Sequence, residues 1–112
     1  MKTLPFDKNK IERISSVWPT PFYIYDEAGI AANAAAIKDA FAWNKGFREY
    51  FAVKAAPNAQ LMKLLQGYGF YSDCSSMAEL LLAEKVGNIG DRIMFTSNDT
   101  PDEEFKKAVE LG

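Results

Sequence analysis

From Glu49 onward, short apolar segments alternate with helical segments of about ten residues. The apolar segments lie at 49–55, 70–74 and 92–96, and the helical segments at 60–66, 76–86 and 102–111. This alternation favours βαβ connections and a parallel sheet. The sequence therefore predicts three successive β-α units in an α/β fold.

Three parallel strands with helices on one side leave the other face of the sheet uncovered. A (β/α)8 barrel covers that face by closing on itself, and it needs roughly 250 residues. The chain has 112 residues and stops where a fourth strand is due. We therefore expect a partial (β/α)8 TIM barrel, truncated, with residues 1–19 as a lead-in and 20–112 as the barrel portion. The alternative is that a second copy covers the exposed face.

The lead-in and the segment after it carry weaker signals. Lys8–Ser16 predicts one helical turn, and the aromatic and β-branched run Phe22–Tyr25 predicts a strand. Asp26 is a candidate N-cap for a helix over Ala28–Trp43, where apolar residues recur at spacings of three and four.

Composition excludes several kinds of chemistry. The chain has no histidine, so histidine bases and histidine metal sites are ruled out, and its single cysteine, Cys74, cannot form an intrachain disulfide. The net charge is −2, and there is no basic stripe, long apolar stretch or secretory signal. We expect a cytoplasmic protein that binds neither nucleic acid nor membrane.

Lys54 is the first candidate for chemistry. It lies at the carboxyl end of the predicted strand, which is the active-site end in a barrel. Its apolar neighbours are expected to desolvate the amine partly and make it a better nucleophile toward an aldehyde. A lysine at a strand end can also simply extend its ammonium group into water.

Asp73 ends the second strand on the same predicted edge, where it could orient Lys54 or cap the next helix. Glu79 is either the capping-box partner of Ser76 or an active-site carboxylate. Cys74 is expected to be a small buried residue. The remaining polar candidates in the loops are expected to cap helices or meet a ligand; they are Ser75, Ser76, Ser97 and Asn98. A second capping box, with proline at the first helical position, is expected over 100–103, and Glu103, Glu104, Lys106 and Lys107 are expected to form a solvated helix face.

Four segments resemble one family in the right order. YFAVKAAPN at 50–58 resembles the cofactor-lysine motif of the fold-type III, alanine-racemase-like decarboxylases, and DCSSMAEL at 73–80 resembles the segment after their second barrel strand. TPFYIYD at 20–26 and RIMFTSNDTPDEEF at 92–105 resemble the diaminopimelate decarboxylase subgroup. One departure is Ala56, where the family often has asparagine.

The resemblance implies pyridoxal 5'-phosphate as cofactor, Lys54 as the Schiff-base lysine and Asp73 as a cofactor-binding carboxylate. It leaves both roles of Glu79 open. It implies an amino-acid decarboxylase that acts on meso-diaminopimelate, or on ornithine, arginine or carboxynorspermidine, and a homodimer in which the partner contributes to the substrate site. The family's phosphate-binding loop, histidine and β-domain fall outside these residues, so the 112-residue chain alone is expected to be inactive. A non-catalytic pyridoxal phosphate carrier is the alternative from another class.

Overall fold

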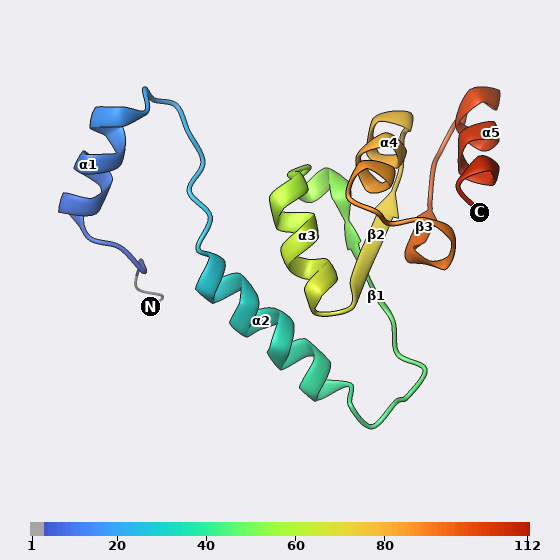
Figure 1. Ribbon diagram of the computed structural model, residues 1–112, viewed down its shortest axis with the longest axis horizontal. Coiled ribbons are helices and arrows are strands. Elements are labelled where there is room, and N and C mark those ends of the chain that lie inside the picture. Colours follow the sequence, from blue (N-terminus) through green and yellow to red (C-terminus); the bar gives the residue numbers. More distant parts are fainter. Residues whose placement is uncertain (1–3) are drawn as a thin grey trace.

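The three expected β-α units are present. The structure, a computed structural model, describes residues 4–112 and contains one parallel sheet with the strand order β1-β2-β3 (Figure 1). The strands are β1 (Glu49–Ala52), β2 (Phe70–Cys74) and β3 (Ile93–Phe95). The helices that follow them are α3 (Ala59–Gly67), α4 (Met77–Lys85) and α5 (Asp102–Glu110).

Burial alternates along β2 and separates the two faces of the sheet. Phe70, Ser72 and Cys74 are buried, and β2 packs against α3 and α4. Because successive side chains of a strand point to opposite faces, Tyr71 and Asp73 lie on the other face, where they are only half-buried. The helix side of the sheet therefore holds the core.

Two apolar clusters form that core. The first lies between the sheet, α3 and α4 and consists of Val53, Met62, Cys74, Leu80, Ala83 and Val86. The second joins α2 (Glu27–Ala40) to α3 and the start of β2, and it consists of Ala34, Leu61, Leu65 and Phe70. Helix α3 thus buries an apolar side, whereas α2 buries only Ala34 of its predicted apolar side and leaves Ile37 exposed.

The opposite face of the sheet is open. Tyr50 and Tyr71 are neighbours in register, with ring centroids 5.8 Å apart. The guanidinium of Arg92 lies 5.8 Å from the centroid of the Tyr71 ring, and Met94 of β3 is 46% exposed. The expected uncovered face is therefore confirmed for the part of the chain that the structure describes.

The N-terminal part stands apart from the sheet (Figure 1). The helical turn expected from Lys8 is a ten-residue helix, α1 (Lys8–Val17), capped by Asp7, whose Oδ1 accepts a 2.8 Å hydrogen bond from the N–H of Lys10. The predicted strand Phe22–Tyr25 is wrong: the segment has no regular secondary structure and pairs with no strand among the described residues. Aromatic and β-branched residues favour extended backbone, yet a strand also requires a neighbour for its hydrogen bonds.

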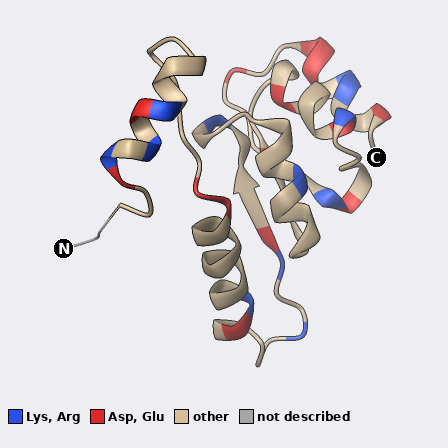
Figure 2. Ribbon diagram, turned by 60° about the vertical axis from the view of Figure 1, so that its left-hand side comes forward, with Lys and Arg blue, Asp and Glu red and all other residues tan. Residues whose placement is uncertain are grey.

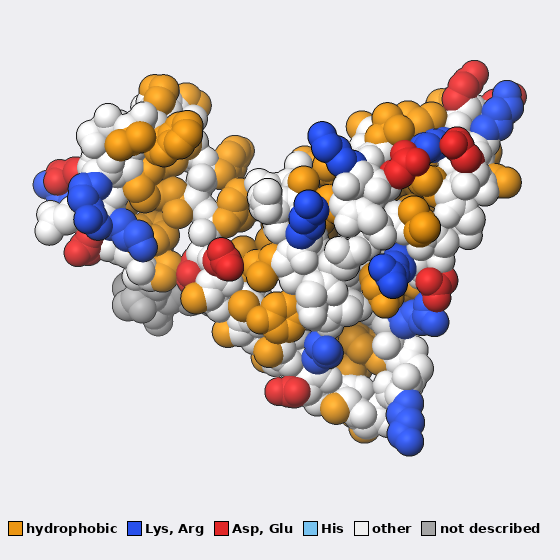
Figure 3. Space-filling model, in the orientation of Figure 1, with side chains coloured by type: hydrophobic (Ala, Val, Ile, Leu, Met, Phe, Trp, Pro, Cys, Tyr) orange, Lys and Arg blue, Asp and Glu red, His pale blue; other side chains and the backbone are white. Residues whose placement is uncertain are grey.

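This part exposes much of its apolar surface. Trp18 is 65% exposed and Tyr23 is 89% exposed, and Figure 3 shows hydrophobic side chains gathered there. No helix of residues 4–112 is both long and apolar enough to cross a membrane.

The predicted helix after Asp26 is present but ends at Ala40 instead of Trp43. Phe41 leaves the helix and stacks on Phe47 at a centroid distance of 4.2 Å, which folds the chain back toward β1. Asp26 occupies the N-cap position, but its side chain makes no cap hydrogen bond.

The expected solvated face of α5 is wrong for two of its four residues. The Oε1 of Glu104 accepts a hydrogen bond from the backbone of α4, and Lys107 pairs with Glu84 of α4 at 3.0 Å. Figure 2 shows the acidic first turn of α5 followed by its lysines. Pro101 is the N-cap of α5 rather than its first helical residue, so the expected capping box does not form.

Candidate active site

Lys54 follows β1 instead of ending it. β1 stops at Ala52, and Val53–Ala55 form a 3-10 turn closed by a 3.1 Å hydrogen bond from the Ala56 N–H to the Val53 carbonyl. Val53 is fully buried and anchors this turn in the core, whereas Lys54 is exposed. The expected partial desolvation of Lys54 is therefore wrong for this structure, and the amine is open to solvent at the carboxyl end of the sheet.

Asp73 lies at the same end, on the central strand. It is in register with Ala52 on one side and Met94 on the other, and these three residues share the open face. Lys54 is two residues beyond Ala52, so the topology brings Lys54 and Asp73 to one edge. No ion pair joins them within residues 4–112.

The partner of Asp73 is Thr96, which is not among the site residues predicted from the sequence. The Oγ1 of Thr96 donates a 2.5 Å hydrogen bond to the Oδ1 of Asp73. Thr96 directly follows β3, at the edge where the parallel strands end. Its place in the sequence could have predicted the contact with Asp73, because the carboxyl ends of neighbouring parallel strands meet at one edge of the sheet.

Glu79 holds the loop between β2 and α4. Its Oε2 accepts a 2.9 Å hydrogen bond from the Ser75 N–H, and its Oε1 accepts bonds from the Ser75 and Ser76 hydroxyls at 3.1 and 3.3 Å. Ser76 occupies the N-cap position without bonding a helix N–H. The expected capping box is thus only partly formed: the glutamate reaches back to the hydroxyl of the cap residue, but the backbone N–H that it accepts from belongs to the residue before the cap.

Cys74 has the structural role expected of it. Its side chain is fully buried on the helix side of β2, away from the open face. Burial, together with the nearby charges of Glu79 and Asp73, raises the pKa of the Cys74 thiol to about 12. The residue is therefore a thiol, not a nucleophilic thiolate, at neutral pH.

Ser97 and Asn98 are the loop residues after Thr96. Their side chains make no hydrogen bond with the residues that the structure describes, so neither caps α5. They remain available at the same edge as Lys54 and Asp73.

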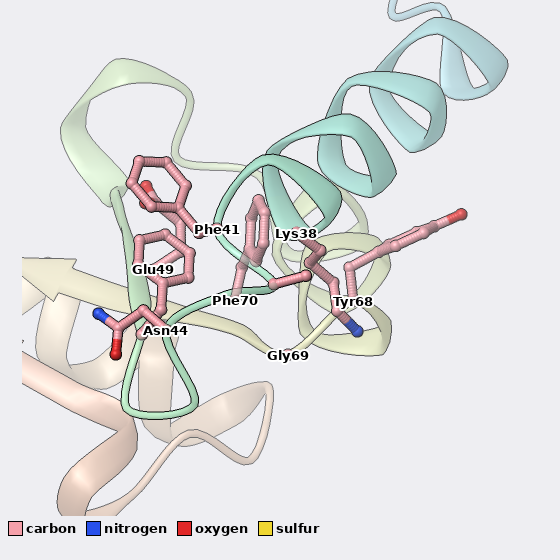
Figure 4. A pocket seen from close by; sticks show the side chains of 9 residues that line it. Lys38, Phe41, Asn44, Glu49, Tyr68, Gly69 and Phe70 are labelled. Carbon is pink, nitrogen blue, oxygen red and sulfur yellow. The ribbon is translucent and has the colours of Figure 1, made fainter.

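A hollow of about 230 Å³ lies at the opposite edge of the sheet. Figure 4 shows Lys38 and Phe41 from the end of α2, with Tyr68 and Phe70, around it. Glu49 and Phe70 begin their strands there. In barrels this edge serves stability, whereas chemistry sits at the carboxyl edge, so the hollow is not a candidate active site.

Comparison with known proteins gives one family. Residues 27–112 match the family described as pyridoxal-dependent decarboxylase, pyridoxal binding domain. Protein TabA of Pseudomonas amygdali pv. tabaci is 44% identical over 102 residues, which cover 91% of this chain and 24% of that protein. Diaminopimelate decarboxylase of Archaeoglobus fulgidus is 34% identical over 103 residues, which cover 92% of this chain and 24% of that protein.

Solved structures agree on the fold. Diaminopimelate decarboxylase from Helicobacter pylori, complexed with L-lysine, is 31% identical with a TM-score of 0.73, covering 90% of this chain and 25% of that chain. Lysine decarboxylase from Selenomonas ruminantium has a TM-score of 0.86 at 20% identity, covering 99% of this chain and 29% of that chain, and it supports the fold alone.

The chain spans about a quarter of the length of these relatives. The structural neighbours are decarboxylase barrels, and the three parallel β-α units agree with a partial TIM barrel. The family's cofactor is pyridoxal phosphate, as expected. This chain belongs to the pyridoxal-dependent decarboxylases and forms part of their pyridoxal-binding domain.

Proposed function

We propose that this chain provides the lysine-bearing edge of a pyridoxal phosphate-dependent amino-acid decarboxylase. One observation carries the proposal: Lys54 is exposed two residues beyond the end of β1, at the edge where Asp73 is the next-to-last residue of the neighbouring strand. Residues 27–112, which contain both, match a pyridoxal-binding domain.

The groups at this edge fit the cofactor chemically. An aldehyde requires a primary amine that it can reach, and Lys54 is exposed. The Oδ2 of Asp73 accepts no hydrogen bond from residues 4–112, so one carboxylate oxygen is free to face a cation. Pyridoxal phosphate, when bound, supplies the electron sink for the electrons left behind when a carboxylate departs as CO2.

Each residue has a distinct role in the proposal. Lys54 would hold the cofactor through its aldehyde, with loss of water, and Asp73 would orient the lysine nitrogen through its charge. Glu79 keeps the β2–α4 loop in place through Ser75. The groups that hold the phosphate and the ring nitrogen come from other parts of the enzyme.

We further propose meso-diaminopimelate as the substrate and L-lysine as the product. Relatives named diaminopimelate decarboxylase, at 28–34% identity, support this choice. A relative named L-glutamyl-[BtrI acyl-carrier protein] decarboxylase is 29% identical, so the same domain occurs with other substrates. Ornithine, arginine and carboxynorspermidine are the alternatives, and a non-catalytic pyridoxal phosphate carrier is the rival class.

In this proposal, the protein that carries the complete decarboxylase activity is longer than these 112 residues, cytoplasmic and homodimeric. The chain covers only 24–28% of the curated relatives, which leaves the remaining cofactor contacts unaccounted for. Residues 1–112 alone are expected to be inactive.

The lysine assignment is tested by visible absorbance of the full-length protein loaded with pyridoxal phosphate. Lys54→Ala should abolish the absorbance band of the lysine-bound cofactor. Lys63→Ala, which removes an exposed lysine of α3, is the matched control and should keep it. A band that survives Lys54→Ala would refute the assignment.

Substrate choice is tested by release of CO2 from meso-diaminopimelate, ornithine, arginine and carboxynorspermidine in parallel. The proposal expects meso-diaminopimelate to give the highest kcat/KM and L-lysine to accumulate. If another amino acid gives a higher kcat/KM, that amino acid is the substrate instead. If the lysine-bound band forms but none of the four amino acids releases CO2, the non-catalytic carrier is favoured.

A further inference from the structure

The contact between Thr96 and Asp73 links two strands at the carboxyl edge of the sheet. Thr96 lies one residue beyond β3, yet its backbone continues the ladder: its N–H donates a 2.9 Å hydrogen bond to the carbonyl of Cys74. Asp73 and Met94 are register partners on the open face. Because side chains alternate along a strand, Thr96 shares that face with Met94 and Asp73.

The side chain of Thr96 is therefore held from two directions. The backbone bond to Cys74 places its Cα, and β-branching restricts its χ1 angle, so its hydroxyl has few directions to choose from. In the structure that hydroxyl donates to the Oδ1 of Asp73 at 2.5 Å. A carboxylate that accepts such a bond loses rotational freedom. Because the group is planar and rigid, fixing its Oδ1 also fixes the direction of its Oδ2.

Folding alone gives little reason for this bond. Thr96 is exposed and Asp73 is half-buried, so water competes for both groups. The bond joins residues 23 positions apart at the edge that carries Lys54, and not in the core. Its consequence is the fixed direction of one carboxylate.

We propose that Thr96 is a positioning residue: it orients the Asp73 carboxylate toward the bond between Lys54 and the cofactor. This inference rests on the function proposed above. Thr96 itself touches neither Lys54 nor the cofactor in this scheme and acts only through Asp73.

The test uses the full-length protein freed of cofactor and titrated with pyridoxal phosphate, with the visible absorbance and circular dichroism of the lysine-bound band as readouts. Thr96→Val removes the hydroxyl at nearly constant shape. It should weaken cofactor binding by about tenfold, the scale of one hydrogen bond to a charged group, and alter the dichroism of the band. Thr96→Ser keeps the hydroxyl and should stay within about twofold of the parent protein.

A double-mutant cycle gives the decisive outcome. If Thr96 acts through Asp73, Asp73→Asn combined with Thr96→Val should differ from Asp73→Asn by less than about twofold in cofactor affinity. Effects that multiply, or a Thr96→Val protein with parental affinity and dichroism, would overturn the inference. Thr96→Ala removes the same hydroxyl and completes the cycle if the valine variant does not fold.

The same experiment separates this inference from the proposed function. Survival of the band in Lys54→Ala refutes the lysine assignment, and the inference with it. If Lys54→Ala loses the band but the effects of Thr96→Val and Asp73→Asn on cofactor affinity multiply, only the role of Thr96 is refuted and the lysine assignment stands.

Discussion

Glu104, in the first turn of α5, accepts a 2.8 Å hydrogen bond from the backbone N–H of Met77, the first residue of α4. The first N–H groups of a helix have no partner within the helix. Ser76 precedes α4 but does not bond these groups. A carboxylate from the neighbouring helix therefore satisfies the start of α4.

Replacing Glu104 with alanine should destabilise the fold. The α4 N–H loses its acceptor, and loss of a helix cap costs about 0.5–2 kcal/mol in the free energy of unfolding. Urea unfolding followed by circular dichroism measures the change. Glu103→Ala, at an exposed neighbour with no hydrogen bond to the described residues, should stay within about 0.5 kcal/mol of the parent. Equal losses in the two variants would contradict this role of Glu104.

Asn88 should be the most sensitive polar residue of the core. It is 1% exposed, donates to the Ser72 hydroxyl at 2.7 Å and accepts from Gln66 at 2.7 Å. Asn88→Ala leaves the buried Ser72 hydroxyl without this donor and should cost about 1–3 kcal/mol in unfolding free energy.

The control for Asn88 is a cycle with Ser72→Ala. Adding Ser72→Ala to Asn88→Ala should cost less than Ser72→Ala costs alone, because the hydroxyl has already lost its partner. Additive losses in urea unfolding would show that the two side chains do not act together.

Lys107 should make the free energy of unfolding depend on pH in the alkaline range. Its pKa is raised above the ordinary value of 10.5, first by its hydrogen bond to Glu84 and also by the charges of Glu84 and Glu110. A raised pKa in the folded state means that the stabilisation is complete below the ordinary value and is lost as pH rises through the raised one.

Lys107→Met should therefore be less stable than the parent at pH 7, with the difference shrinking above pH 10.5. Thermal unfolding across pH 7 to 11.5 measures it. Lys106→Met is the control at pH 7, because Lys106 is exposed and forms no ion pair with the described residues, and it should stay within about 0.5 kcal/mol of the parent. A Lys107 difference that stays constant would contradict the ion pair.

The open sheet face should make the 112-residue chain self-associate. Met94 is 46% exposed on that face, where it is in register with Asp73, and association buries such apolar surface. Sedimentation velocity should show association that grows with concentration and is reduced by Met94→Glu. Val109→Glu adds the same charge on α5, where Val109 is 81% exposed, and should have a smaller effect. A chain that stays monomeric at all concentrations would contradict self-association through the open face of the sheet.

Local patterns identified most elements because local physics produces them. Phe70–Cys74 is the predicted strand without change, and the helix predicted from Ser76 is α4. Phe22–Tyr25 shows the limit of such patterns: its residues favour extended backbone, but strand pairing depends on a neighbour that the segment itself does not specify.

For the site, the order of strands and helices along the chain already indicates which residues reach the carboxyl edge, because parallel strands bring their ends together. Lys54 and Asp73 follow from that rule alone. Their surroundings follow from the folded arrangement instead. Lys54 is exposed, and the hydrogen bonds Thr96–Asp73 and Glu104–Met77 join residues 23 and 27 positions apart. These bonds depend on how helices and strand ends pack, and packing is a property of the whole assembly of elements rather than of any segment.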